Sequence, residues 1–167
     1  MVRPHDFGFN EQTGTDNEFQ HRPKTAGEAL LSSKNAMAEF EQMVNIMRNA
    51  SVEVLLLDKA ETSMILPDAI FPNNWFSTTS DGRLFLYPMK TKNRQAEVQE
   101  KELQALFDAN NYMLNEVIDL RCITLADGQR MKALEGTGSL VFHHPTGTIF
   151  AAISERCNKT ELDYFAD

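Results

Sequence analysis

The chain has 167 residues, of which 42% are hydrophobic and 24% charged, and its formal net charge is −8. These proportions are ordinary for a globular domain, and a chain of about 150 residues can bury a sizeable core. The acidic balance argues against nucleic acid or an anionic membrane surface as a partner, and no apolar run approaches the ~18 residues that span a bilayer.

The cysteines and histidines show no recognisable metal-binding pattern. Cys122 and Cys157 lack metal-ligand spacing, which predicts free thiols in a reducing cytoplasm. His143 and His144 are adjacent, so they lack the i, i+4 spacing that places a histidine pair on one helix face, and they fit a hairpin end. We therefore expect no metal, no cofactor and a cytoplasmic location.

The N-terminal segment predicts a strand end followed by a long loop. Residues 1–4 resemble the tail of an apolar strand. Residues 5–24 are rich in Asn, Thr, Gly and Gln, with three phenylalanines among them. Loops of this length without secondary structure are usually functional or disordered, and the aromatic residues favour a packed loop.

Residues 25–49 predict an amphipathic helix, because apolar residues recur there at three- and four-residue steps. Thr25 or Ser33 could cap this helix. We expect its apolar stripe to face the core; the stripe comprises Leu30, Ala36, Met37, Phe40, Met43, Val44 and Met47. The apolar run at residues 52–57 then predicts a buried strand.

Residues 67–78 join an acid, two adjacent amides and the single tryptophan to the start of a strand. They read Pro-Asp-Ala-Ile-Phe-Pro-Asn-Asn-Trp-Phe-Ser-Thr. Surface loops rarely place two bulky aromatic residues beside two asparagines, and a buried amide needs several hydrogen-bond partners once water is gone. The stretch therefore fits either a lined polar pocket or a well-satisfied turn.

The remaining chain predicts hairpins that alternate with helices. The expected elements are a hairpin at 75–87, a helix at 94–107, a strand at 112–118, a polar turn at 125–131 around Asp127-Gly128, a hairpin at 139–153 and a helix start at 158–165. The order hairpin, helix, strand occurs once and begins again, which is a structural repeat of roughly 60 residues. This order indicates α/β blades around an axis rather than a doubly wound sheet.

Glu135 stands before a Gly-Thr-Gly turn in Leu-Glu-Gly-Thr-Gly-Ser, just ahead of a predicted strand. Glycines permit close approach of a ligand, but the glutamate would repel a phosphate and no P-loop lysine follows. A glutamate held there could accept hydrogen bonds from a cationic or amide group, or move a proton. The alternative is an exposed Glu in a hairpin-entry loop.

Two arginines follow the hairpins at corresponding places. Arg94 lies in Lys-Asn-Arg-Gln-Ala-Glu and Arg156 in Ser-Glu-Arg-Cys-Asn. The arginine side chain matches a carboxylate bidentately, so the pair could bind the carboxylate of an amino acid. Alternatively, each could be a member of a surface ion pair.

Together these motifs resemble the guanidino-group-modifying enzymes of the pentein fold, which include arginine deiminases, dimethylarginine hydrolases and glycine amidinotransferases. The shared motifs are Pro-Asp-x-x-Phe-x-x-Asn, Asn-Arg-x-x-Glu, Leu-Glu-Gly-x-Gly and Ser-x-Arg-x-Asn. Met-Val-Arg-Pro-x-x-Phe-Gly-x-Asn, Phe-Pro-Asn-Asn-Trp-Phe-Ser and Leu-Glu-Gly-Thr-Gly-Ser resemble the bacterial arginine-deiminase-related branch, which includes citrulline-utilisation hydrolases. The resemblance covers essentially the whole chain.

The resemblance implies a five-bladed α/β propeller with the active site at its axis. It implies that the planar nitrogen group of the substrate is lined by Asp68, Asn73 and Asn74. Glu135 matches the acid that orients this group. Arg94 and Arg156 match residues that bind the substrate carboxylate, and the loop around Phe9 and Asn10 matches a segment that covers the substrate.

One departure concerns the nucleophile. The related enzymes use a cysteine near the C-terminus and a histidine after the third helix, and this chain reaches Asp167 before either. Cys122, Cys157 and the four histidines do not match them. We therefore expect residues 1–167 to form an incomplete pentein domain of two to three blades, without its first strand, that is inactive by itself.

The resemblance implies a hydrolase that acts on a guanidino or ureido amino acid by covalent cysteine catalysis. The neutral pair Asn73 and Asn74 suits the uncharged ureido group of citrulline better than the cation of arginine, because an amide both donates and accepts hydrogen bonds. Alternatives are an amidinotransferase and a non-catalytic pentein binding factor. The expected partner is a small amino acid, and the sequence leaves open the exact substrate and whether a homo-oligomer forms.

Overall fold

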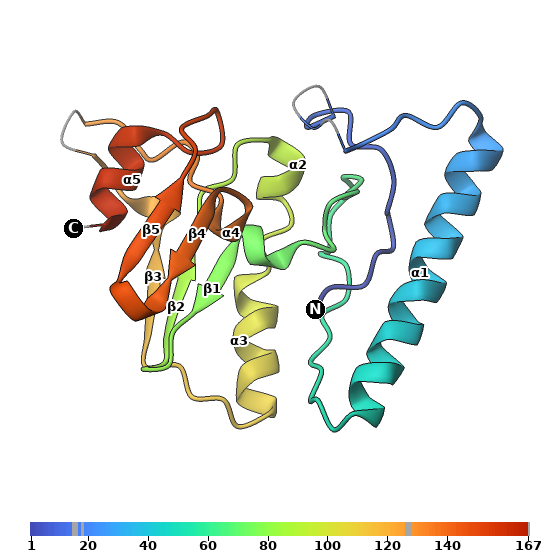
Figure 1. The fold of residues 1–167 in the computed structure, drawn as a ribbon, viewed down its shortest axis with the longest axis horizontal. Coiled ribbons are helices and arrows are strands. Elements are labelled where there is room, and N and C mark those ends of the chain that lie inside the picture. The colour runs from blue at the N-terminus through green and yellow to red at the C-terminus, as the bar shows by residue number, and fades with distance from the viewer. Residues whose placement is uncertain (15–16, 18, 126–127, 167) are drawn as a thin grey trace. The chain divides into compact units, whose positions relative to one another are not determined.

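The computed structural model describes residues 1–14, 17, 19–125 and 128–166, and the chain divides into two compact units. The first unit comprises Met1–Pro72 and Ala96–Leu106, and the second comprises Asn73–Gln95 and Phe107–Asp167. Figure 1 shows the elements, which in chain order are α1 (Ala26–Asn49), η1 (Pro72–Asn74), β1 (Phe76–Thr78), β2 (Arg83–Leu86), α2 (Lys92–Gln95), α3 (Glu100–Ala109), β3 (Glu116–Asp119), η2 (Leu120–Cys122), α4 (Gly136–Ser139), β4 (Leu140–His143), η3 (His144–Thr146), β5 (Thr148–Ala151) and α5 (Lys159–Ala166).

Helix α1 of the first unit confirms the helix predicted at residues 25–49. It begins after Thr25, whose hydroxyl oxygen accepts a hydrogen bond from the backbone N–H of Glu28 at 3.1 Å. The Glu28 carboxylate accepts in turn from the backbone N–H of Lys24 at 2.7 Å, so two N–H groups at the helix start are satisfied. Thr25, rather than Ser33, is therefore the cap.

The expected core stripe of α1 is buried only in part. Phe40 and Val44 are buried and form a small core with Val54, whereas Leu30 is 58% and Met43 41% exposed. The buried cluster lies at the C-terminal half of the helix, where Leu56 and Ile70 pack against it. The periodicity identified the correct face, but it did not show how much of that face would be covered.

The strand predicted at residues 52–57 does not form, which corrects the sequence interpretation. The segment makes a single parallel bridge, between Leu57 and Val2, with N–H···O distances of 3.1 Å and 2.8 Å. The predicted strand end at residues 1–4 is reduced to this same bridge. Pairing stops there because the backbone N–H of His5 turns back to the carbonyl oxygen of Arg3, at 3.0 Å.

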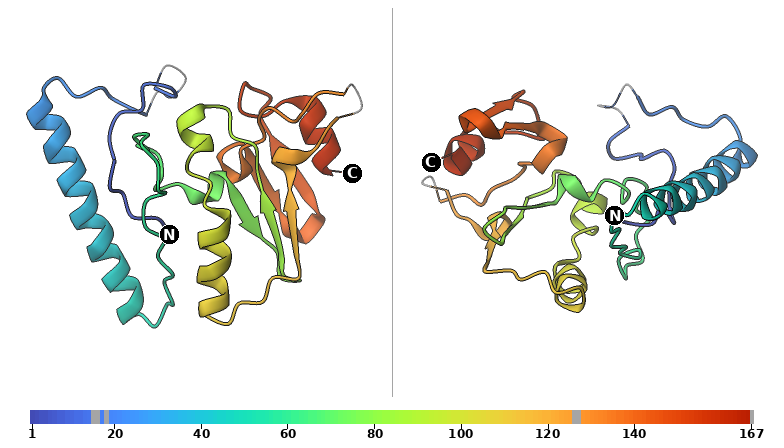
Figure 2. Two further views of the ribbon diagram at one scale, coloured as in Figure 1. Left: turned by 180° about the vertical axis from the view of Figure 1, so that it is seen from behind. Right: turned by 60° about the horizontal axis from the view of Figure 1, so that its bottom comes forward.

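The second unit contains a three-stranded sheet in the order β1-β2-β3 (Figure 2). Strands β1 and β2 pair antiparallel, which confirms the first predicted hairpin, and β3 pairs parallel with β2. Gly82 occupies the hairpin turn with a φ of 82°, a conformation that glycine adopts without a steric penalty. The polar turn expected at Asp127 lies outside the described residues, although Gly128 beside it also has a positive φ.

The single helix predicted at residues 94–107 is interrupted, and α2 and α3 are separate helices. Glu97 and Gln99 in the connection are both buried. The Gln99 side-chain amide donates to the backbone carbonyl of Asp58 at 3.0 Å, and the Gln99 carbonyl accepts from the first turn of α3. These polar contacts replace a turn of helix, and the apolar periodicity does not encode them.

The second hairpin and the last helix complete this unit. Strands β4 and β5 pair antiparallel, and α5 follows them, as expected. The Phe165 ring of α5 makes edge contacts with the rings of Phe85, Tyr87 and Phe142, so this helix packs on residues of both sheets. The order hairpin, helix, strand, hairpin, helix is confirmed, and the number of propeller blades stays a prediction. Among the described residues, no helix is long and apolar enough to cross a membrane.

Candidate functional site

The two adjacent asparagines of the second unit pack directly on the turn formed by α4. A methyl group in place of the hydrogen of Gly136 would lie 2.6 Å from the carbonyl oxygen of Asn73 and 3.1 Å from that of Asn74. Such a distance is too short for carbon, so only glycine permits this approach. The glycine that follows Glu135 therefore brings the two predicted site segments together.

Glu135 is 2% exposed, and both of its carboxylate oxygens accept hydrogen bonds. Oε1 accepts from the backbone N–H of Lys90 at 3.1 Å, and Oε2 accepts from Nε of Arg156 at 2.7 Å. The backbone N–H of Glu135 also donates to the carbonyl oxygen of Arg156, at 3.1 Å. The glutamate thus holds Arg156 by both backbone and side chain, which excludes the exposed hairpin-entry glutamate considered above.

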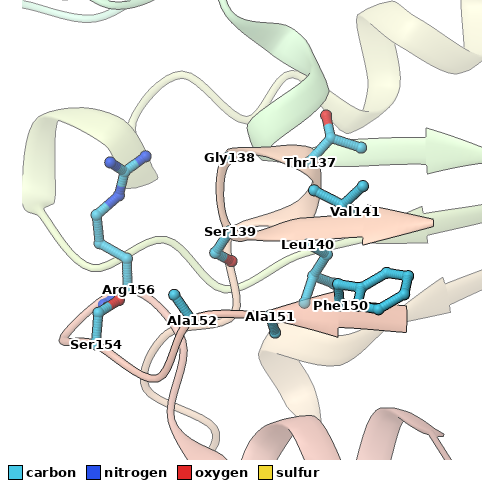
Figure 3. A pocket seen from close by; sticks show the side chains of 10 residues that line it. All are labelled: Thr137, Gly138, Ser139, Leu140, Val141, Phe150, Ala151, Ala152, Ser154 and Arg156. Atoms are coloured by element: carbon cyan, nitrogen blue, oxygen red, sulfur yellow. The ribbon is translucent and has the colours of Figure 1, made fainter. Parts of the chain in front are cut away.

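Arg156 extends from this ion pair to the edge of a pocket of about 460 Å³ (Figure 3). The pocket lies along β4 and β5, with Thr137, Val141 and Phe150 among its lining residues. The Arg156 side chain is 35% exposed, and Glu135 is its single side-chain partner among the described residues. The bond to Glu135 uses Nε, so the terminal nitrogens are left for other partners, and Nη2 lies near Gly138.

Arg94 and Asn74 form a second buried contact, in which Nη2 of Arg94 donates to Oδ1 of Asn74 at 2.8 Å. Arginine has no acceptor atom, so the oxygen of the amide must face Arg94 and Nδ2 must face the other way. A methyl group at Gly138 would lie 2.8 Å from this Nδ2 and 3.1 Å from Nη2 of Arg156. Two hydrogen-bond donors therefore converge on Gly138.

Asn73 is held by Thr137 through two hydrogen bonds. Nδ2 of Asn73 donates to the Thr137 hydroxyl oxygen at 2.7 Å, and that hydroxyl donates to the backbone carbonyl of Asn73 at 3.3 Å. The structure thus brings together Asn73, Asn74, Arg94 and Arg156 with Glu135 in the second unit.

Asp68 and Phe9, the other two predicted site residues, belong to the first unit. Both oxygens of the buried Asp68 carboxylate accept hydrogen bonds from the loop at residues 5–24. Oδ2 accepts from the amide of Asn10 at 2.6 Å and the hydroxyl of Thr13 at 3.1 Å, and Oδ1 accepts from the amide of Gln20 at 2.9 Å. These contacts confirm a packed loop.

Phe9 lies in the same loop and contacts a guanidinium of the chain itself. The Arg22 guanidinium lies 4.6 Å from the centre of the Phe9 ring, which is a cation–π distance. Arg22 also forms a two-point ion pair with Glu11, and both side chains are largely exposed. Whether Phe9 covers a substrate stays a prediction.

Several contact residues were missed from the sequence. Thr137 was noticed only for the glycines on either side of it, and no sequence signal marked Thr13, Gln20 or the backbone N–H of Lys90 as partners of the two carboxylates. Such partners depend on which loops meet in space. Among the described residues, no group of three His, Cys, Asp or Glu side chains could hold a metal ion.

Comparisons with known proteins place the chain in a family. Among curated proteins, no sequence matches the chain. The crystal structure, without ligand, of an arginine dihydrolase from the ornithine–ammonia cycle in cyanobacteria is similar, with a TM-score of 0.56 and 21% sequence identity. The match covers 81% of this chain and 19% of that chain, and it supports the mixed α/β fold of the penteins. The family model of eukaryotic N,N-dimethylarginine dimethylhydrolase matches residues 3–167, so the chain belongs to the N,N-dimethylarginine dimethylhydrolase family.

Proposed function

We propose that this chain forms the substrate-binding part of a hydrolase that acts on a C–N bond of a guanidino or ureido amino acid. The observation that carries the proposal is the convergence of Asn74 Nδ2 and Arg156 Nη2 on Gly138, beside the pocket. Both nitrogens are hydrogen-bond donors, and Arg156 also lines the pocket, where its guanidinium can bind an oxygen atom of a ligand. Membership of the dimethylarginine dimethylhydrolase family supports the reaction class.

Arg156 is our candidate for binding the substrate carboxylate. Its Nε is fixed by Glu135, while its terminal nitrogens lie at the pocket edge, where they can form charge-assisted hydrogen bonds with a carboxylate. Arg94 was predicted to share this role. Because it is buried and one of its terminal nitrogens holds Asn74, we assign Arg94 to fixing the Asn74 amide.

The two amides favour a ureido group over a guanidinium. Asn74 uses its oxygen on Arg94 and can present a donor, while Asn73 uses its NH2 on Thr137 and can present an acceptor. A ureido group carries one carbonyl acceptor and N–H donors, so it can pair with both. A guanidinium carries donors alone, and the donor of Asn74 would meet no acceptor on it.

Neither thiol of the chain suits the nucleophilic step. The family resemblance assigns that step to a thiolate, which adds to the central carbon, expels ammonia or an amine and is released by water. The hydrogen bond to the Asp119 carboxylate raises the pKa of Cys122, and burial raises the pKa of Cys157. Both changes favour the unreactive thiol, so we expect the 167-residue chain to bind substrate without turnover.

Titration of the purified chain by calorimetry tests the proposal with L-citrulline, L-arginine and N-butylurea, which has the ureido group but no carboxylate. We expect citrulline to bind more tightly than either of the others. Arg156→Ala should weaken citrulline binding by about tenfold, the effect of one charge-assisted hydrogen bond, and should leave N-butylurea unchanged. Lys159→Ala, which removes an exposed lysine paired with Asp163, is the matched control.

Three results would contradict the proposal. A wild-type chain that binds none of the ligands would remove the substrate-binding role. A clear preference for arginine would refute the ureido assignment. Release of ammonia from citrulline or arginine by the purified chain would show that one of its own thiols reacts.

A further inference from the structure

The two adjacent amides differ in what fixes them. Asn74 is buried, and its orientation is imposed by Arg94, which can only donate. Asn73 has an exposed side chain, and among the described residues Thr137 is the single partner of its amide. An exposed amide without a partner rotates between orientations that differ by exchange of oxygen and NH2. The contact with Thr137 therefore decides which end of Asn73 is presented.

The direction of the Asn73–Thr137 contact follows from the whole network. The Thr137 hydroxyl donates its single proton to the backbone carbonyl of Asn73, at 3.3 Å. Its oxygen can then accept from the Asn73 amide, and the atom of that amide that lies 2.7 Å away is Nδ2. Oδ1 of Asn73 is consequently directed away from Thr137 and is available to a ligand.

The α4 turn is shaped to make this contact. Gly136 lets the backbone of the turn approach the carbonyl oxygens of both asparagines, and Gly138 leaves room for the Asn74 amide. Thr137, between the two glycines, is therefore carried to Asn73 by the close packing of the turn. It also lines the pocket that Arg156 reaches.

We infer that Thr137 is a positioning residue that fixes the Asn73 amide with its oxygen toward the ligand, and that it thereby sets the preference for a ureido over a guanidinium group. The second half of this inference rests on the proposed function, and the first half does not. Thr137 itself need not touch the substrate. Its hydroxyl, rather than its size, performs the role.

The ligand-free test is NMR of the side-chain NH2 groups. The Asn73 signal is assigned by its loss in Asn73→Asp, and its proton exchange with water is measured in wild type, Thr137→Val and Thr137→Ser. We expect exchange to be about threefold faster in the valine variant, which keeps the shape but loses the hydroxyl, and restored by serine. The Asn115 side chain donates to the Asp81 carbonyl at 2.8 Å, and its exchange should stay constant as the internal control for folding.

The ligand test is the ratio of citrulline to arginine affinity for the same three proteins. Thr137→Val should reduce this ratio about fivefold, the value of one neutral hydrogen bond, and Thr137→Ser should keep it. If Thr137 had a merely structural role, Thr137→Val would lower the affinity for both ligands equally and leave the ratio unchanged.

The outcomes separate the two proposals. Unchanged Asn73 exchange in Thr137→Val would overturn the positioning role whatever the ligands do. If Thr137→Val shows the expected faster exchange of the Asn73 amide protons but an unchanged ratio of citrulline to arginine affinity, the role of Thr137 in specificity is overturned. If the wild-type chain binds neither ligand while the Asn73 exchange responds as expected, the proposed function fails and the positioning of Asn73 by Thr137 stands.

Discussion

Asp68 in the first unit and Glu135 in the second are both buried carboxylates, and each holds a segment of its own unit. From the loop at residues 5–24, Asp68 accepts the hydrogen bonds of two amides and a hydroxyl, which are neutral donors. Glu135 accepts from a backbone N–H and from the charged Arg156. Amides and hydroxyls can rotate to present either a donor or an acceptor, whereas a guanidinium and a backbone N–H can only donate.

The two carboxylates therefore fix different parts of the chain. The neutral donors around Asp68 fasten a loop of the first unit, and they can adapt when one acceptor is lost. The partners of Glu135 cannot adapt, so this carboxylate fixes the position of Arg156 with little tolerance.

Glu135→Gln should cost about 3 kcal/mol of unfolding free energy, because the change removes the charge of a buried carboxylate and leaves one of its two donors without an acceptor. The glutamine amide offers one oxygen to two obligate donors, so either Lys90 N–H or Arg156 Nε loses its acceptor. Urea denaturation measures the loss. Glu155→Gln is the control, since this exposed partner of Lys90 should contribute less than about 0.5 kcal/mol. Equal losses in the two variants would contradict the assignment.

Gly138→Ala should cost about 2 kcal/mol, because the added methyl group would lie 2.8 Å from the Asn74 amide and force it or Arg156 to move. Gly8→Ala adds the same group where the nearest atom is 3.8 Å away, and it serves as the control. Thermal unfolding and citrulline titration should both respond at Gly138. A stable Gly138→Ala variant with unchanged binding would show that the two donors do not converge there.

Asp68→Asn should loosen the loop at residues 5–24 only modestly, since the Gln20 amide and the Thr13 hydroxyl can reorient toward the new NH2. Hydrogen exchange should rise at the backbone amides of Gln12 and Gly14, which lie in the fastened loop. Asp58→Asn, at an exposed acid of the same unit, should leave these amides unchanged. Complete loss of protection at these two amides would refute the idea that the loop donors adapt.

The smallest expected effect is on how the free energy of unfolding depends on acid pH. One carboxylate in each unit contributes to it: Asp6 in the first unit and Asp119 in the second. Burial raises the pKa of Asp6, but hydrogen bonds from Lys59 and the Leu66 N–H outweigh it and lower the pKa below 3.8. At Asp119, Arg121 likewise outweighs burial. A carboxylate whose pKa is lower in the folded state than in the unfolded state stabilises the fold at pH values above its unfolded-state pKa. This contribution is lost as the pH falls through its folded-state pKa.

Asp6→Asn and Asp119→Asn should each make the decline of unfolding free energy below about pH 4 shallower than in wild type. Urea denaturation between about pH 6 and 2 measures this slope. Asp163→Asn, at an exposed i, i+4 pair with Lys159, should keep the wild-type slope. A slope that none of the three variants changes would contradict the two lowered pKa values.

The long helix, the two hairpins, their order and the family could all be predicted from the amino-acid sequence. These features depend on local signals: the Thr25 cap and apolar periodicity for α1, Gly82 for the first turn, and contiguous motifs around Asn73-Asn74 and Glu135 for the family. Each signal lies within a few residues of the element that it specifies, so no knowledge of distant contacts is needed to read it.

The tertiary structure alone decided which predicted elements survive and what each site residue contacts. Residues 52–57 do not form a strand because they find only a single bridge to Val2, and the helix expected at 94–107 is interrupted where Gln99 reaches Asp58. The same holds for the direction of the two amides, which Arg94 and Thr137 impose from distant parts of the chain. Hydrogen-bond direction depends on the partner that arrives, and sequence spacing does not specify that partner.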